Sequence, residues 1–166
     1  MGGTMTETFD SRPTVRRATM SDLSVIVAFN GALALETENK QLDEPTLRRG
    51  VEAALSDGRR CAYFVAEIAD TVVGQTMITF EWSDWRSRWF WWIQSVYVRP
   101  EDRGRGVFKA LYEHIYDACR AAPDTAGLRL YVEKSNELAR ETYLRLGMSL
   151  ASYDMFEVDS LRGIRV

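Results

Sequence analysis

The chain has 166 residues, of which 46% are hydrophobic and 27% charged, a composition typical of one globular domain. Its 21 basic and 24 acidic residues give a net charge of −3, which argues against nucleic acid as the main partner, because nucleic-acid binders carry a basic excess. The longest charge-free stretch, residues 23–35, is shorter than the roughly 20 apolar residues of a membrane-spanning helix, so no membrane partner is expected.

The two cysteines, Cys61 and Cys119, are far apart and form no CxxC pair. This pattern favours neither a metal site nor a disulfide framework, and a reducing cytoplasm is the expected location. No basic segment followed by a long apolar block marks a secretory signal. We expect residues 1–13 to be a disordered tail, residues 14–158 to form the domain, and residues 159–166 to form a C-terminal tail.

The first third of the domain predicts a short strand and two helices. Residues 14–17 suit an edge strand. The capping box Thr19-x-x-Asp22 then precedes apolar residues at helical spacing over residues 23–34. Asp43-Glu44-Pro45 predicts the start of a second helix, which Gly58 ends.

Strand patterns dominate the middle of the chain. Residues 62–68 and 72–80 are β-prone and flank a turn at Asp70-Thr71, and residues 89–98 form a third strand that Arg99-Pro100 stops. The remaining elements expected are a helix over 107–119, a strand over 127–133, a helix over 139–146 ended by Gly147, and a last strand over 149–158. This order predicts an α/β (α+β) fold, a mixed sheet with helices on both faces.

The most informative stretch is Arg103-Gly104-Arg105-Gly106, between a buried strand and a helix. Glycine lets the main chain approach an anion closely, and the start of a helix presents N–H groups and the positive end of its dipole. Arg103 and Arg105 would add charge-assisted hydrogen bonds. The sequence therefore predicts a pyrophosphate-like ligand here. The alternative is a tight turn with two solvated arginines. The stretch is neither a Walker loop nor a dinucleotide-binding fingerprint, which needs a third glycine.

These residues resemble the signature of the GNAT superfamily of N-acetyltransferases, Gln/Arg-x-x-Gly-x-Gly/Ala, with Phe108 in place of the usual final Gly/Ala. A second motif of that family appears at Asn136-x-x-Ala139-x-x-x-Tyr143-x-x-x-Gly147, with Met148 where Phe is usual. The resemblance covers about residues 14–158. It implies a GNAT-like, mostly antiparallel sheet of six to seven strands flanked by about four helices, and acetyl-CoA as the cofactor.

The resemblance also implies where acetyl-CoA lies, in a V-shaped opening between the fourth and fifth strands. Its pantetheine would pair with a strand backbone, and its pyrophosphate would lie on the N–H groups of the glycine loop. The cofactor-binding residues implied are Val96, Tyr97, Val98, Arg103, Gly104, Arg105, Gly106, Val107, Phe108, Lys109, Asn136 and Tyr143. Asn136 also suits a helix N-cap, and the two roles are compatible. A main-chain N–H over residues 96–98 would meet the developing oxyanion.

Tyr143 matches the family tyrosine near the thioester sulfur, where a phenol can protonate the leaving thiolate. The alternative is a core residue of its helix. Many relatives carry a carboxylate where this chain has Gln94, and an amide accepts no proton at neutral pH. Glu81, at the end of the preceding strand, is the first candidate for the catalytic base. The other candidates are Glu133 on the fifth strand and Glu36 and Glu38 after the first helix. Glu36, Glu38 and Gln94 are also expected to contact the acceptor.

The expected function is acetyl-CoA-dependent transfer of an acetyl group to a primary amine of a small molecule or a peptide or protein. Neither motif contains a cysteine to carry the acyl group, which favours direct transfer. All five tryptophans fall within residues 82–92. We expect them to pack a β-hairpin. The alternative is that their rings, together with Glu36 and Glu38, bind a cationic amine.

Two other functions remain open. One is transfer of a different acyl group, or transfer to a hydroxyl. The other is a regulatory module that binds acetyl-CoA or CoA without turnover, a reading that Gln94 favours. A homodimer is also expected, in which residues 160–166 exchange between subunits and cover a sheet edge.

Overall fold

The computed structural model describes residues 12–156 and residue 158. The chain forms two compact units, one ending at Leu130 and the other beginning at Tyr131. The tails expected over 1–13 and 159–166 lie outside the described residues, apart from residues 12 and 13.

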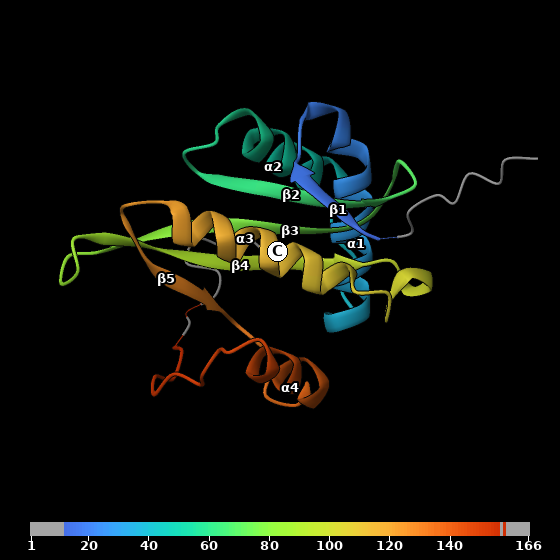
Figure 1. Cartoon of the computed structure of the whole chain (residues 1–166). Coiled ribbons are helices and arrows are strands. Elements are labelled where there is room, and N and C mark those ends of the chain that lie inside the picture. The colour runs from blue at the N-terminus through green and yellow to red at the C-terminus, as the bar shows by residue number, and fades with distance from the viewer. Residues whose placement is uncertain (1–11, 157, 159–166) are drawn as a thin grey trace, which may run out of the picture. The chain divides into compact units, whose positions relative to one another are not determined.

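The elements follow the predicted order as far as the last helix (Figure 1). They are β1 (Thr14–Arg17), the 3₁₀ helix η1 (Met20–Asp22), α1 (Leu23–Glu38), α2 (Glu44–Ser56), β2 (Cys61–Ile68), β3 (Thr71–Ser83), β4 (Arg88–Val98), the 3₁₀ helix η2 (Pro100–Asp102), α3 (Val107–Ala121), β5 (Thr125–Leu130) and α4 (Glu137–Arg145).

The strand predicted over residues 149–158 is wrong, because the described residues of this segment form no strand. Its large apolar side chains are exposed, with Leu150 at 74%, Tyr153 at 85% and Phe156 at 95%. A strand needs a hydrogen-bonded neighbour and a buried face, and alternating apolar residues alone supply neither. The strand predicted over residues 127–133 also stops early, at Leu130.

The strands of the first unit form one sheet in the order β1-β2-β3-β4-β5. The pairs from β1 to β4 are antiparallel, and β5 runs parallel to β4. The sheet is therefore mixed and mostly antiparallel, as predicted, with five strands among the described residues instead of six or seven. The turn between β2 and β3 is made by Ala69 and Asp70, both left-handed, one residue earlier than the predicted Asp70-Thr71, because Thr71 already begins β3.

Helices cover both faces of this sheet: α1 and α2 lie on one face and α3 on the other (Figure 1). The alternation of side chains along β2 explains the arrangement. Tyr63 packs in the core formed with Ile26 of α1 and Val51 of α2. The next residue, Phe64, faces α3, where its ring centroid lies 5.3 Å from that of His114.

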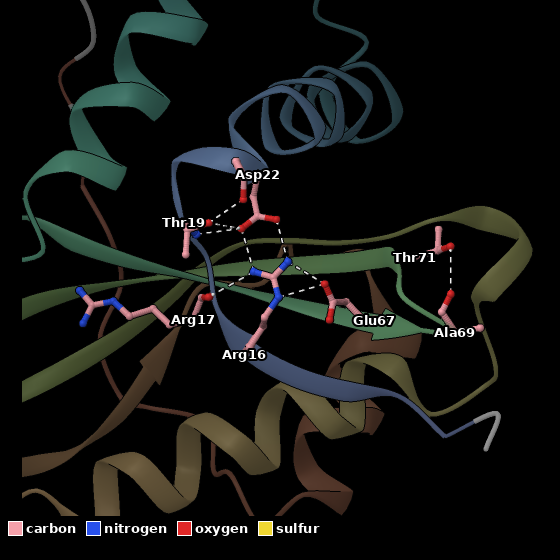
Figure 2. A network of polar contacts seen from close by, with 8 residues as sticks. Arg16, Arg17, Thr19, Asp22, Glu67, Ala69 and Thr71 are labelled. Atoms are coloured by element: carbon pink, nitrogen blue, oxygen red, sulfur yellow. Dashed lines mark hydrogen bonds and ion pairs between the residues drawn. The ribbon is translucent and has the colours of Figure 1, made fainter. Parts of the chain in front are cut away.

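A charged network ties the start of α1 to the sheet edge (Figure 2). Arg16 of β1 donates two hydrogen bonds to the Asp22 carboxylate, at 2.8 and 2.9 Å, and two to Glu67 of β2, at 2.9 and 2.6 Å. Asp22 also accepts the main-chain N–H of Thr19 at 2.8 Å, as the predicted capping box requires. The hydrogen bonds from Arg16 hold the pKa of the buried Asp22 below its ordinary value.

Two other helix ends follow their predicted signals. The Asp43 carboxylate accepts the main-chain N–H of Thr46 at 2.9 Å and caps α2. Gly147, with a φ of +87°, follows α4, where the left-handed conformation ends a helix at least cost.

Candidate active site

A β-bulge interrupts the pairing of β3 with β4. Gln94 and Tyr97 pair with residues of β3 that are two apart, so Ser95 and Val96 together lie opposite a single residue. Ser95 has a φ of +50°, a conformation that costs a residue with a side chain about 1–2 kcal/mol. The bulge is thus a strained point, and its surroundings must stabilise it.

Beyond the bulge, β4 has a strand neighbour on one side only. Its pairing with β5 stops at Ile93, which lies beside Leu130. In the described part of the first unit, residues 94–98 pair with β3 alone. The main chain of Val96, Tyr97 and Val98, predicted to bind pantetheine, therefore lies along an edge of β4 that no other strand of the described first unit pairs with; we call it the open edge.

The predicted phosphate loop follows η2 and leads into α3. Gly104 and Gly106 have φ values of +77° and +80°, which glycine adopts without steric cost. A Cβ built on either residue would meet no atom within 4 Å, so the space beside both is open. Ala110 N–H donates to Gly106 O at 3.0 Å, which makes Gly106 the N-cap of α3 and places the positive end of the helix dipole at the loop. This geometry suits an anion.

Both arginines of the loop have protein partners. Arg105 Nη1 lies 2.5 Å from a carboxylate oxygen of the buried Asp102. Arg103 donates Nη2 to Glu36 at 2.6 Å and Nε to the Val98 carbonyl at 3.0 Å. No local sequence signal marks these contacts, which connect the loop to Asp102, Glu36 and Val98. A guanidinium carries five N–H donors, more than these contacts use, so an anion can still be bound.

Glu36 lies beside the loop, in the last turn of α1. The expectation that Glu36 and Glu38 follow the first helix is wrong, because α1 continues to Glu38. Glu36 Oε1 accepts the hydroxyl of Tyr97 at 3.3 Å, while Oε2 accepts Arg103. Burial, reinforced by the nearby Glu36 carboxylate, raises the pKa of Tyr97, so its hydroxyl stays protonated. Glu38 is exposed.

Gln94 lies on β4 and Glu81 on β3, and the Gln94 side chain reaches the same face of β3 that carries Glu81. Gln94 donates Nε2 to Thr79 Oγ1 at 2.8 Å. Glu81 lies four residues along β3 from the partner of Gln94, about 13 Å at the rise of a strand. Its two oxygens accept the Trp92 indole N–H at 2.5 Å and the Arg129 guanidinium at 2.9 Å. Nothing in the local sequence links Glu81 to these partners.

The second unit contains the other motif residues. The Asn136 side chain accepts the main-chain N–H of Ala139 at 3.1 Å and is the N-cap of α4. Tyr143 lies in α4, and burial raises the pKa of its hydroxyl, which therefore keeps its proton at neutral pH. Glu133 was expected on the fifth strand, but it follows the end of β5 at Leu130.

The described residues contain no group of three or more His, Cys, Asp or Glu placed to hold a metal ion. None of their helices has both the length and the apolar character needed to cross a membrane. Cys61 and Cys119 are buried thiols, and burial raises the pKa of each. A buried, protonated thiol is a poor nucleophile, which fits transfer without a cysteine intermediate.

Residues 30–148 match the model of the acetyltransferase (GNAT) family. A chain from Clostridium difficile 630 described as a possible acetyltransferase is 46% identical, with a TM-score of 0.83 over 89% of this chain and 97% of its own. A predicted acetyltransferase with acetyl-CoA from Clostridium acetobutylicum is 18% identical, with a TM-score of 0.70 over 90% of this chain and 97% of its own.

A ribosomal-protein-alanine N-acetyltransferase from Brucella melitensis biovar Abortus 2308 is 16% identical, with a TM-score of 0.72 over 88% of this chain and 97% of its own. At such identities these last two proteins show a common fold alone. No curated protein matches the sequence.

Proposed function

Because the chain belongs to the acetyltransferase (GNAT) family, we propose that it transfers the acetyl group of acetyl-CoA directly to a primary amine of a small molecule or of a peptide or protein. The observation that carries the proposal is the loop before α3. Gly104 and Gly106 are both left-handed there, and open space lies where their Cβ atoms would be. Such a loop at a helix N-terminus suits the pyrophosphate of acetyl-CoA.

Different segments of this chain would bind different parts of acetyl-CoA. The main chain from Arg103 to Lys109 would bind the pyrophosphate, and the open edge of Val96–Val98 would pair with the pantetheine as an added strand does. Asn136 would contact the pantetheine arm in addition to capping α4. Acetyl-CoA supplies an activated thioester, and this chain orients it.

Two groups would act on the reacting atoms. A main-chain N–H over residues 96–98 would donate to the carbonyl oxygen as it becomes an oxyanion. The Tyr143 hydroxyl would donate its proton to the departing thiolate, and its raised pKa keeps that proton available. Transfer is direct in this scheme, since no thiol carries the acetyl group.

An ammonium acceptor must lose a proton before it attacks, and Gln94 cannot take it. Glu81 remains the first candidate for the base, although it must exchange Trp92 or Arg129 for the substrate to do so. The variant Glu81→Gln should then lower kcat by roughly 10²–10⁴-fold, the usual contribution of a general base. An unchanged kcat would shift the role to Glu36, which already faces the glycine loop. Glu36, Glu38 and Gln94 would contact the acceptor, and the two carboxylates favour a cationic amine.

Gln94 also favours a second candidate function, a regulatory module that binds acetyl-CoA without turnover. Tight binding in calorimetry with no turnover on any amine would support it. Competition between thioesters would distinguish acetyl transfer from transfer of another acyl group, and a hydroxyl acceptor would appear as turnover on alcohols.

The proposed setting is the cytoplasm, which the two free thiols favour. The proposed assembly is a homodimer. Its expected contact segment, residues 160–166, lies outside the described residues. Light scattering at micromolar concentration measures the assembly, and the mass of a monomer would contradict it.

Calorimetric titration with acetyl-CoA tests the role of the glycine loop. Gly106→Val should weaken binding at least tenfold, because a branched side chain there strains the left-handed main chain and enters the space proposed for the anion. The matched control is Gly50→Val, since Gly50 also has open space but lies in the regular helix α2. Equal affinity in wild type and Gly106→Val would refute the assignment.

A further inference from the structure

Three polar side chains from three elements converge on the bulge at Ser95. Gln75 of β3 donates Nε2 to Asn30 Oδ1 of α1 at 2.7 Å and to the Ser95 carbonyl at 3.4 Å. Asn30 in turn donates Nδ2 to the hydroxyl of Tyr63 on β2 at 3.1 Å. That hydroxyl also interacts with the Ser95 side chain. The network therefore contacts the main chain and the side chain of the same residue.

The network lies in the core of the first unit, where a polar group is costly. Gln75 has no exposed surface, and Tyr63 is 5% exposed beside fully buried Val65. Gln75 Oε1 is a buried side-chain acceptor that has no hydrogen-bond partner among the described residues. An apolar core of the same shape would avoid this cost. Stability alone does not account for these residues.

What they hold is the strained conformation of Ser95. A non-glycine residue at a φ of +50° persists only where its surroundings over-determine it. Without the bulge, the pairing of β3 with β4 would shift by one residue beyond Gln94, and the side chains of Val96 and Tyr97 would exchange faces. The bulge thus sets which main-chain groups of residues 96–98 lie along the open edge.

We propose that Asn30, Tyr63 and Gln75 are positioning residues of acetyl transfer, which hold the Ser95 bulge and, through it, the main chain that faces the thioester. This inference rests on the proposed function, since it takes the open edge of β4 as the place of acetyl-CoA. The three residues take no proton in the reaction: two are amides, and burial raises the pKa of Tyr63 so that its hydroxyl stays protonated.

Two variants remove parts of the network while keeping volume, namely Tyr63→Phe and Gln75→Met. We expect amide hydrogen exchange at residues 94–97 to become about tenfold faster, while residues 90–93 of the same strand keep their protection. We also expect kcat to fall about tenfold or more, since small displacements of reacting groups are costly. The matched control is Tyr112→Phe, which removes the hydroxyl of a tyrosine that is also 5% exposed, from α3 on the other face of the sheet.

The two readouts separate the possible results. Faster amide hydrogen exchange confined to residues 94–97, together with a fall in kcat, supports the proposal. Unchanged amide hydrogen exchange at residues 94–97 overturns it. Amide exchange that rises evenly over β2, β3 and β4 with a lower Tm also overturns it, since the three residues would then serve stability alone. Faster exchange confined to the bulge, in a protein whose wild type acetylates no amine, supports the positioning of the bulge and contradicts the proposed function instead.

Discussion

At the scale of single residues, the proposed reaction depends most on the Tyr143 hydroxyl. Tyr143→Phe removes that oxygen and keeps the ring and the helix. We expect kcat to fall by roughly 10²–10⁴-fold, the usual contribution of a general acid. The Kd for acetyl-CoA should change little, because the pyrophosphate contacts are assigned to the glycine loop. Steady-state kinetics and calorimetry on the purified variant measure the two effects.

Tyr153→Phe is the control for Tyr143→Phe, because Tyr153 belongs to the same unit and is 85% exposed. A kcat equal to that of the wild type would make Tyr143 a packing residue of α4. Equal losses of binding and turnover would make it a contact for the cofactor and not an acid.

Single residues also show where prediction from sequence stops. The turn at Gly104 and Gly106 and the Asn136 cap of α4 were predicted, because each depends on neighbours within a few positions of the chain. The partners of the charged residues were not. Arg103 meets Glu36 across 67 positions, and Arg129 meets Glu81 across 48. Charged residues have many possible partners along a chain, and only the paired strands and packed helices select one.

At the scale of elements, the Arg16 network fixes the start of α1 against the sheet edge (Figure 2). Its hydrogen bonds lower the pKa of Asp22, so the carboxylate stabilises the fold fully above 3.8, its ordinary pKa, and less as the pH falls through the lower folded value. Asp22→Asn should therefore reduce the free energy of unfolding by about 2 kcal/mol at neutral pH. The difference from the wild type should shrink below pH 3.8.

Urea unfolding across pH measures this effect. The control is Asp43→Asn, since Asn is as good an N-cap as Asp and Asp43 accepts the main-chain N–H of Thr46 in a similar way. Asp43→Asn should change the free energy of unfolding by less than about 0.5 kcal/mol. A loss in Asp22→Asn that is constant across the whole pH range would show that the charge of Asp22 does not matter.

The elements with strong local signals were predicted well, and those that need a partner were not. Capping residues and apolar spacing predicted α1 and α2, and the turn at Asp70 predicted the β2–β3 hairpin. Residues 149–156 contain several large apolar residues but have no buried face, so the composition was misleading there. The bulge at Ser95 has no local sequence signal, and the network beside it joins Asn30, Tyr63 and Gln75 from three other elements.

At the scale of the whole molecule, two motifs and the order of elements sufficed for the fold class and the family. The mixed, mostly antiparallel sheet and the match over residues 30–148 confirm both. The identity of the acceptor is harder to predict from the sequence, since it depends on side chains that distant elements bring together. Glu36 is brought to the glycine loop, whereas Glu81 lies in its own cluster with Trp92 and Arg129.

Amine-dependent release of the CoA thiol measures the proposed acetyl transfer from acetyl-CoA to a primary amine most directly. The purified protein is given acetyl-CoA with a panel of primary amines, amino acids and peptides, and thiol release is followed against the protein without amine. We predict release above that background for at least one primary amine, with release lost at the same acetyl-CoA concentration in Gly106→Val. Tight binding of acetyl-CoA without amine-dependent release from any member of the panel would contradict the claim.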